Sequence, residues 1–236
     1  MKALIIIPAY NEEGNILNTV NEIDKIKIKD INLDYIVIND GSEDLTKQVC
    51  IDNCINFIDL PFNLGIGGAV QTGYKYAENN NYDIAIQFDG DTQHDANYVE
   101  LLIEELKKGN DLVIGSRFIN DISKFKSTKS RRLAIKFLSI LIKLLTGENI
   151  TDPTSGFRAA NRDIIKLFSE NYPHDYPESE TNTMVAKLKY NISEIPVKMN
   201  ERTHGKSSIN SLKYIYFGIK VPLSIIFTSL IYGGKR

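Results

Sequence analysis

The chain has 236 residues, of which 42% are hydrophobic and 25% are charged, a composition that predicts a folded globular protein and excludes a disordered or fibrous one. With only two cysteines, Cys50 and Cys54, the chain lacks a disulfide framework and the ligands of a cysteine zinc site, as expected for a cytoplasmic protein. The formal net charge is −2, but segments 122–147 and 198–236 hold 14 of the 28 basic residues and only one of the 30 acidic residues.

The first half of the chain alternates short apolar runs with amphipathic patterns. The apolar runs that predict strands are 4–7, 35–38, 55–58, 84–88 and 112–114. Apolar residues at helical spacing follow three of these runs, namely Ile16, Leu17, Val20 and Ile23, then Ala69, Tyr74 and Ala77, then Val99, Leu102, Ile103 and Leu106. Apolar strands that alternate with helices predict an α/β fold, a mostly parallel sheet flanked by helices on both faces.

Polar, charged and glycine residues stand at the end of every predicted strand. In chain order they are Tyr10-Asn11-Glu12, Asn39-Asp40-Gly41-Ser42, Asn63-Leu64-Gly65, Asp89-Gly90-Asp91 and Gly115-Ser116-Arg117. Ligands of parallel sheets bind at the carboxyl ends of the strands. Any one of these loops could be a capped turn, but the five together predict a binding site at one edge of the sheet.

The acidic pair Asp89 and Asp91 directly follows the apolar run 84–88. Residues two apart in an extended segment point to the same side, and Gly90 allows the backbone to turn sharply or to approach a ligand. Two carboxylates are hard oxygen ligands that suit Mg²⁺ or Mn²⁺. The pair therefore indicates a cation site for a nucleotide diphosphate, and the alternative is an acidic surface turn.

The glycine-rich segment 65–68 matches neither a dinucleotide-binding fingerprint nor a P-loop. We interpret it as the close packing of a helix start near a ligand.

Seven segments in register give the chain a specific resemblance to a known family. They are 6–12, 39–42, 63–65, 89–94, 115–117, 154–158 and 202–207. Over about residues 2–210 the chain resembles the family 2 glycosyltransferases of the GT-A fold, and among them the dolichyl-phosphate mannose synthases and the bacterial polyprenyl-phosphate glycosyltransferases. The chain has no tryptophan and so lacks the Q-x-x-R-W motif of the processive members.

The resemblance implies an inverting, metal-dependent transfer of a single sugar from a UDP- or GDP-sugar to a polyprenyl or dolichyl phosphate. The implied donor-binding residues are Pro8, Tyr10, Glu12, Asp40, Gly65 and Asp89. The implied ligands of Mg²⁺ or Mn²⁺ are Asp91, Asp89 and Gln93. The implied acceptor phosphate-binding residues are Arg117, Arg131, Arg202, Lys206 and Ser207.

The acceptor decides whether a general base is needed. A phosphate acceptor is already anionic, since its second pKa is about 6, and needs positioning rather than a base. A hydroxyl of a lipid-linked or cell-surface glycan would need a base, for which Asp152 is the catalytic candidate; otherwise Asp152 is a turn residue before Pro153.

Two other function classes also fit parts of the pattern. One is a catalytically dead nucleotide-binding scaffold, against which the intact Asp89 and Asp91 argue. The other is a sugar-1-phosphate nucleotidyltransferase, but the first strand is followed by 10–12 in place of the basic glycine-rich loop that such an enzyme needs.

The two basic segments indicate a surface that faces an anionic partner, for which nucleic acid is one possibility. Because both segments are also rich in large apolar residues, we expect a membrane surface instead, with a peripheral protein on the cytoplasmic face and no nucleic acid partner. We expect a catalytic domain over 1–210 and an apolar, basic helical tail over 211–236. Within 129–145, one helix side is basic (Lys129, Arg132, Lys136, Lys143) and an apolar face holds Phe137, Leu138, Leu141 and Leu145. This pattern is typical of an interfacial helix, and equally of a helix packed on the sheet with a solvated basic face.

The largely apolar run 221–232 has 12 residues, whereas a membrane span needs about 20. We expect the tail to lie in the membrane interface, to dock on a membrane protein or to form an oligomer contact.

Overall fold

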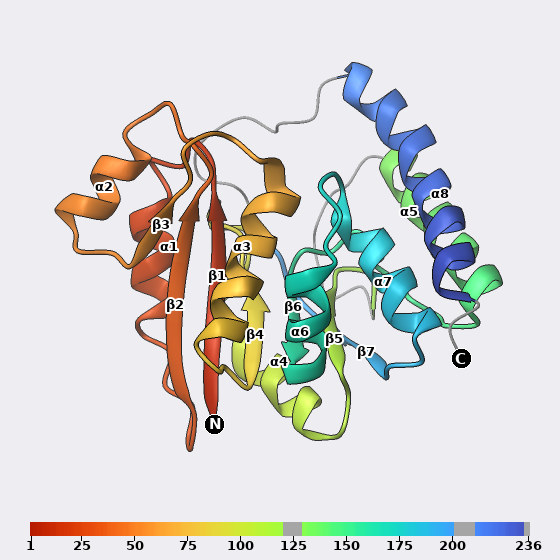
Figure 1. Ribbon diagram of the computed structural model, residues 1–236, viewed down its shortest axis with the longest axis horizontal. Coiled ribbons are helices and arrows are strands. Elements are labelled where there is room, and N and C mark those ends of the chain that lie inside the picture. The colour runs from red at the N-terminus through yellow and green to blue at the C-terminus, as the bar shows by residue number, and fades with distance from the viewer. Residues whose placement is uncertain (120–128, 201–210, 234–236) are drawn as a thin grey trace.

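The computed structural model of the protein describes residues 1–119, 129–200 and 211–233, which form a seven-stranded sheet in the order β3-β2-β1-β4-β6-β5-β7 (Figure 1). The strands are β1 (Lys2–Ala9), β2 (Asn32–Asn39), β3 (Phe57–Asp59), β4 (Ile84–Gln87), β5 (Leu112–Ser116), β6 (Arg158–Asn161) and β7 (Ile192–Pro196). All neighbouring strands run parallel except β6, which is antiparallel to both β4 and β5. The predicted α/β fold with a mostly parallel sheet is therefore confirmed.

Helices cover both faces of the sheet. They are α1 (Ile16–Ile23), α2 (Thr46–Asp52), α3 (Gly65–Asn79), α4 (Tyr98–Lys107), α5 (Lys129–Thr146), α6 (Arg162–Glu170), α7 (Pro177–Lys187) and α8 (Ser211–Gly233). One hydrophobic core joins the sheet to α3, α5, α6, α7 and α8, and the second joins it to α1, α2 and α4.

Side chains of β1 alternate between the two cores. Leu4 and Ile6 pack into the core with α3, whereas Ile5 and Ile7 pack into the core with α1 and α4. All four are fully buried, because a strand with helices on both faces has no solvated side. Polar chemistry in this strand is thus confined to its ends.

No apolar run in the sequence predicted β6 or β7. Strand β6 has the sequence Arg-Ala-Ala-Asn and is held between β4 and β5 by backbone hydrogen bonds, so it needs no large apolar side chains to join the sheet. Strand β7 is an edge strand, half-buried along its whole length. Neither strand carries the hydrophobic signal on which strand prediction depends.

Glycines let α3 approach its neighbours closely. A Cβ atom on Gly73 would lie 2.2 Å from Cγ2 of Ile6 in β1, and a Cβ on Gly67 would lie 2.0 Å from the carbonyl oxygen of Pro173. The N–H of Gly67 donates to the carbonyl of His174 at 3.1 Å. The glycine-rich segment therefore holds the chain around 173–174 against the start of α3.

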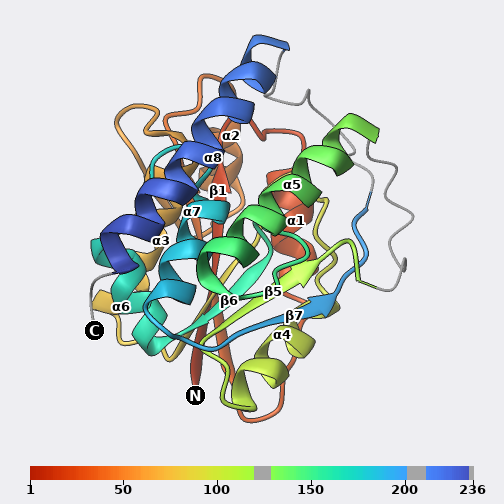
Figure 2. The ribbon, with the colours of Figure 1, turned by 90° about the vertical axis from the view of Figure 1, so that its right-hand side faces the viewer.

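The C-terminal helix α8 packs on α5 and α7, and Figure 2 shows α5 and α8 running side by side. Val221 and Ile225 of α8 are buried in the core, so the helix is attached to the rest of the molecule rather than free of it. By length and composition the segment Tyr216–Gly233 is apolar enough to cross a membrane, with a mean hydropathy of 1.3 and 22% of it buried.

The close approach at Gly67 leads to a stability prediction. We expect Gly67→Ala to lower the free energy of unfolding in urea by about 1–3 kcal/mol, because the new methyl group overlaps backbone atoms. Gly218→Ala in α8 is the matched control: nothing lies within 4 Å of its Cβ position, so the change should stabilise the helix by about 0.5–1 kcal/mol. Equal effects of the two substitutions would contradict the packing argument.

Candidate functional site

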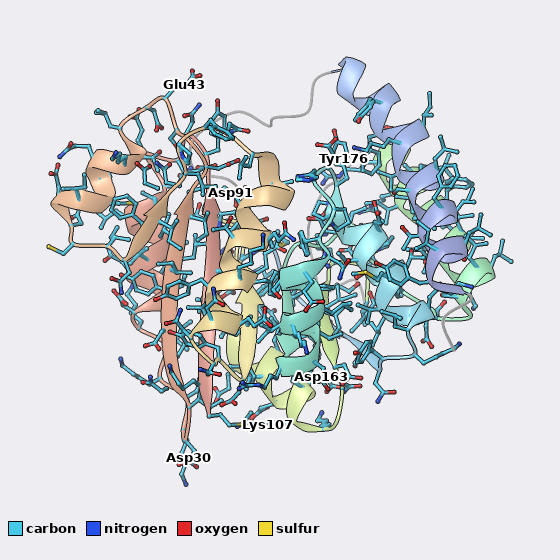
Figure 3. The ribbon with its side chains drawn as sticks, viewed as in Figure 1. Asp30, Glu43, Asp91, Lys107, Asp163 and Tyr176 are labelled. Atoms are coloured by element: carbon cyan, nitrogen blue, oxygen red, sulfur yellow. The ribbon has the colours of Figure 1, made fainter. Side chains whose placement is uncertain are left out.

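The carboxyl ends of β1, β2 and β4 meet the start of α3 around a pocket of about 500 Å³. Most of its lining comes from the loops after these strands and the first turns of α3: Pro8, Ala9, Tyr10, Glu12, Asp40, Asn63, Gly65, Ile66, Ala69, Asp89, Gly90 and Asp91. Asp175, Tyr176 and Tyr216 complete it. In Figure 3 the labelled Asp91 and Tyr176 flank the first turns of α3.

Two acidic residues at the ends of β1 and β2 are held by neighbouring loops. Glu12 is 8% exposed, its N–H donates to the Thr46 hydroxyl at 2.8 Å, and its carboxylate accepts from the Asn15 side chain at 2.6 Å. Asp40 accepts from the N–H of Leu64 at 2.7 Å. Burial raises the pKa of Asp40, while backbone hydrogen bonds act in the opposite direction. Both carboxylates are thus fixed in the pocket rather than mobile.

His94 orients the first aspartate of the acidic pair. Its Nδ1 accepts from the N–H of Asp89 at 3.0 Å, and its Nε2 lies 3.5 Å from the Asp89 carboxylate. The imidazole stacks on Phe157 with ring centroids 4.7 Å apart, and burial lowers the pKa of His94. His94 is therefore a neutral hydrogen-bonding residue at neutral pH, and Asp89 keeps one side towards the pocket.

Glycines bring other backbone segments close to the acidic pair. A Cβ on Gly90 would lie 3.2 Å from the carbonyl oxygen of Pro8, and a Cβ on Gly156 would lie 3.3 Å from the Asp89 carboxylate. Because β6 runs between β4 and β5, the segment that leads into it passes directly beside Asp89. A side chain at either position would require its neighbours to shift slightly.

The residues around Asp91 fit a hard divalent cation. Asp89 and Asp91 both line the pocket and offer carboxylate oxygens, the donor type that Mg²⁺ and Mn²⁺ prefer, and these ions keep further positions for water and phosphate. Within the described part of the chain, no cluster of three or more His, Cys, Asp or Glu residues forms a closed metal site. Two carboxylates that leave open positions are what binding through substrate phosphates requires.

Gln93 follows in the same turn but does not line the pocket. Its N–H donates to the Asp91 carboxylate at 3.1 Å, and its carbonyl accepts from the N–H of Asn200 at 2.8 Å. The chain that enters segment 201–210 therefore starts beside the acidic turn. Arg202, Lys206 and Ser207 of that segment lie outside the described residues.

Arg117 and Asp152 form a buried ion pair with each other. The guanidinium donates from Nε to Oδ2 at 2.6 Å and from Nη2 to Oδ1 at 2.7 Å, and the backbone N–H of Arg117 adds a bond of 3.1 Å. The two side chains are 7% and 0% exposed. Glu194 of β7 accepts from the backbone N–H of Asp152 at 3.0 Å. Arg117 and Asp152 both lie outside the pocket lining. The negative charge of Asp89 nevertheless favours the charged form of Arg117.

The remaining acceptor candidate, Arg131, is exposed on α5. The structure thus brings the predicted donor residues and the acidic pair into one pocket, and it places Arg117, Asp152, Gln93 and Arg131 outside that lining. Their roles in the reaction stay predictions.

Several residues near the site were given no role from the sequence. Arg158 at the start of β6 is fully buried, faces Gln87 across the strand pair, and donates to the Thr181 hydroxyl at 2.7 Å. Glu178 of α7 interacts electrostatically with Arg158 and Asp89, and burial raises its pKa. The available sequence signal for Arg158 was an arginine next to the small residues of β6. No sequence signal marked Glu178, because only the fold brings α7 close to Asp89.

The family description "Glycosyl transferase family 2" matches residues 4–168, more than half of the chain. The chain belongs to this family. The resemblance predicted from the seven segments is confirmed, and the protein is a glycosyltransferase.

Relatives of this glycosyltransferase include enzymes named for polyprenyl-phosphate acceptors. A UDP-N-acetylglucosamine–dolichyl-phosphate N-acetylglucosaminyltransferase of Methanococcus voltae is 33% identical over 215 residues, covering 82% of this chain and 84% of the relative. An undecaprenyl-phosphate mannosyltransferase of Micrococcus luteus is 26% identical over 220 residues, covering 89% of this chain and 88% of the relative.

Among solved structures, the glucosyl-3-phosphoglycerate synthase of Mycobacterium tuberculosis in complex with Mn²⁺, UDP and glucosyl-3-phosphoglycerate has a TM-score of 0.70 to this chain. It is 19% identical, and the match covers 100% of this chain and 81% of that one. The likeness shows a shared GT-A type of fold.

The buried ion pair gives the glycosyltransferase a testable energetic feature. We expect Asp152→Ala to lower the free energy of unfolding in urea by about 3–5 kcal/mol, because it leaves the Arg117 guanidinium buried without its counterion. The control is Glu22→Ala, which removes an exposed pair with Lys25 and should change the free energy by less than about 1 kcal/mol. If both substitutions change the free energy of unfolding equally, the buried pair stabilises the protein no more than an exposed pair does.

Proposed function

We propose that this glycosyltransferase moves a single sugar from a nucleotide sugar to a polyprenyl phosphate at a membrane surface, with Mg²⁺ or Mn²⁺ as cofactor. The observation that carries the proposal is that Asp89 and Asp91 line the same pocket as the predicted nucleoside-binding residues Pro8, Tyr10 and Asp40. The relatives named for dolichyl and undecaprenyl phosphate support the acceptor class.

In this proposal the pocket binds the nucleoside diphosphate of the donor. Asp91 and Asp89 would hold the cation, with Gln93 as a third oxygen ligand from the same turn, and Gly65 at the start of α3 lines the diphosphate side. A bound divalent ion neutralises negative charge that grows on the leaving diphosphate. Asp40 and Glu12, which their neighbours fix, would position the nucleoside.

The Arg117–Asp152 pair favours a phosphate acceptor over a hydroxyl acceptor. Both carboxylate oxygens of Asp152 accept hydrogen bonds from the positively charged Arg117, which disfavours the proton uptake that a general base needs. We therefore assign Asp152 to positioning the Arg117 guanidinium. A phosphate monoester needs no base, and Arg117, Arg131, Arg202, Lys206 and Ser207 remain our proposed acceptor residues.

A two-helix apolar surface supports attachment to a membrane. It consists of two exposed stripes at helical spacing, Leu133, Phe137, Ile140 and Leu144 on α5 and Ile219, Leu223, Phe227 and Leu230 on α8. Of the two alternatives for α5, a helix packed on the core with a solvated basic side describes most of the predicted apolar face, since Leu138 is buried in the core and Leu141 and Leu145 pack against it. Phe137 is exposed, and the exposed stripe lies among the basic residues instead.

Basic side chains on α5 complement this surface. Arg131, Arg132, Lys136 and Lys143 are exposed, and the helix carries no acidic residue. Each Lys or Arg near an anionic leaflet contributes about 1 kcal/mol of attraction. We propose that these two helices lie against the cytoplasmic face of the membrane, where the lipid phosphate would meet the site.

The metal proposal predicts the effect of Asp91→Ala. Transfer should fall by at least about a hundredfold, since the substitution removes a cation ligand worth several kcal/mol in the transition state. The measurement is lipid-linked product from a panel of UDP- and GDP-sugars with a short polyprenyl phosphate and Mn²⁺ or Mg²⁺. Chelation of the metal from the unmodified protein should abolish the product, and added Mn²⁺ should restore it.

Glu100→Ala, which removes an exposed acid from the first turn of α4, is the control and should leave transfer unchanged. Undiminished transfer by the Asp91 variant would reject the proposed metal site.

The membrane proposal predicts the effect of polar substitutions on the two-helix apolar surface. Phe227→Ser with Leu230→Ser should reduce binding to phosphatidylglycerol vesicles about a hundredfold in flotation, because two exposed apolar contacts of about 1.5 kcal/mol each are removed. Such changes are preferable to deleting α8, which would uncover the core at Val221 and Ile225.

The control pair is Leu45→Ser with Ile51→Ser, two residues that are as exposed but lie at α2, on the other side of the molecule from α8 (Figure 1). Flotation that is the same for both pairs, or absent for the unmodified protein, would count against the membrane surface.

A further inference from the structure

The C-terminal helix contributes to the donor pocket. Asp175 and Tyr176, which precede α7, and Tyr216 of α8 line the same pocket as Asp89 and Asp91. Tyr216 lies 127 positions after Asp89 in the chain, beyond the family match that ends at residue 168. Its side chain is 50% exposed, so one part of the ring packs and the other remains open to a ligand.

The segment that receives α8 is fixed by α3. The bond from Gly67 N–H to the His174 carbonyl and the absence of a Cβ at Gly67 hold residues 173–174 against the start of α3. Tyr176 follows with a φ of 52°, a left-handed conformation that costs energy in a residue with a side chain. This turn places Asp175 and Tyr176 at the pocket before α7 begins.

An Asp175 cluster, made of Asp175, Tyr216 and Lys220, joins this segment to α8. The Asp175 carboxylate accepts a hydrogen bond from the Tyr216 hydroxyl at 3.3 Å and forms an ion pair with the Lys220 ammonium group. That ammonium group also lies 5.3 Å from the centre of the Tyr216 ring. The hydrogen bond with Lys220 lowers the pKa of Asp175, so the carboxylate is charged at neutral pH.

Aromatic contacts fix the same helix turn a second time. The ring of Tyr176 meets Phe217 edge-on with centroids 5.0 Å apart and lies 6.4 Å from the ring of Tyr216. Polar and aromatic contacts thus hold Tyr216 in one position, with its hydroxyl directed to Asp175 and its ring at the pocket.

We propose that Tyr216 is a donor-site residue whose ring contacts the bound nucleotide sugar, and that Asp175 and Lys220 are positioning residues for it. The inference rests on the proposed function, since it names a further contact of the same donor site. A half-exposed aromatic ring presents an apolar face to a sugar or base at low entropic cost. Its hydroxyl is already bonded to Asp175, so the ring face provides the contact.

The same helix carries half of the two-helix apolar surface. Ile219 and Leu223 follow Tyr216 by three and seven positions and are exposed. In this proposal α8 links the membrane contact to the pocket, because Ile219 lies one turn after Tyr216 and the rest of the stripe follows Pro222 in the same helix.

The test is calorimetric titration of the full chain, without lipid, with UDP-N-acetylglucosamine, UDP-glucose and GDP-mannose in the presence of Mn²⁺. For whichever probe binds, Tyr216→Ala should raise the dissociation constant about tenfold, the change that corresponds to about 1.4 kcal/mol of lost contact. Tyr216→Phe keeps the ring and should stay within about threefold of the unmodified protein. Equal affinity of the alanine variant would overturn the inference.

A charge exchange tests the positioning residues separately from stability. Lys220→Asp should weaken binding, because two carboxylates then repel each other next to Tyr216. Adding Asp175→Lys restores the ion pair with opposite polarity and should recover most of the affinity. Lys166→Gln, an exposed lysine on α6, is the control and should have no effect. A double variant that binds no better than Lys220→Asp alone would overturn the positioning role.

The calorimetric result distinguishes failure of the proposed function from failure of the inference about Tyr216. If the unmodified protein binds none of the three probes with Mn²⁺, the donor site itself is wrong and this inference falls with it. If it binds a probe and Tyr216→Ala binds equally well, only the inference is wrong and the proposed function stands.

Discussion

Burial of the central strands on both faces is the constraint on which the rest of this structure depends. Strands β1 and β4 lie in the middle of the sheet and have helices on either side, so every side chain along them is buried except that of Lys2, which begins β1. Polar side chains that meet solvent can leave these strands only at their ends. The carboxyl ends of the parallel strands β1, β2 and β4 lie at one edge, which is why Tyr10, Asp40 and Asp89 share a pocket.

The antiparallel strand β6 gives the pocket its second layer. Because it lies between β4 and β5, the turn before it passes beside Asp89, and a Cβ on Gly156 would lie 3.3 Å from the Asp89 carboxylate. It also places Arg158 opposite Gln87, the last residue of β4, and the buried guanidinium donates to the Thr181 hydroxyl of α7 and interacts electrostatically with Glu178.

Charged groups around the site are held in two ways. Arg117 and Asp152 are buried and bidentate, a geometry in which loss of one partner is costly, so the pair fixes the backbone after β5 to the loop before β6. Asp175 and Lys220 are more exposed, so their ion pair is weaker, and the aromatic contacts of Tyr176 share the work of holding α8. Most of the pocket lining is therefore held by the sheet, whereas Tyr216 depends on a helix with a largely exposed outer face.

The sequence by itself determined the sheet class, the five strands of its first half and the family, since apolar runs and the residues after them are local signals. It also pointed to Pro8, Asp40, Asp89 and Asp91 as one site, because strand ends in a parallel sheet meet by rule. Only the tertiary structure decided that Arg117 bonds to Asp152, that β6 enters the sheet through small residues, and that Tyr216 reaches the pocket. These arrangements bring together residues 35 to 127 positions apart, and no local pattern of polarity encodes which of many distant residues a side chain lies near.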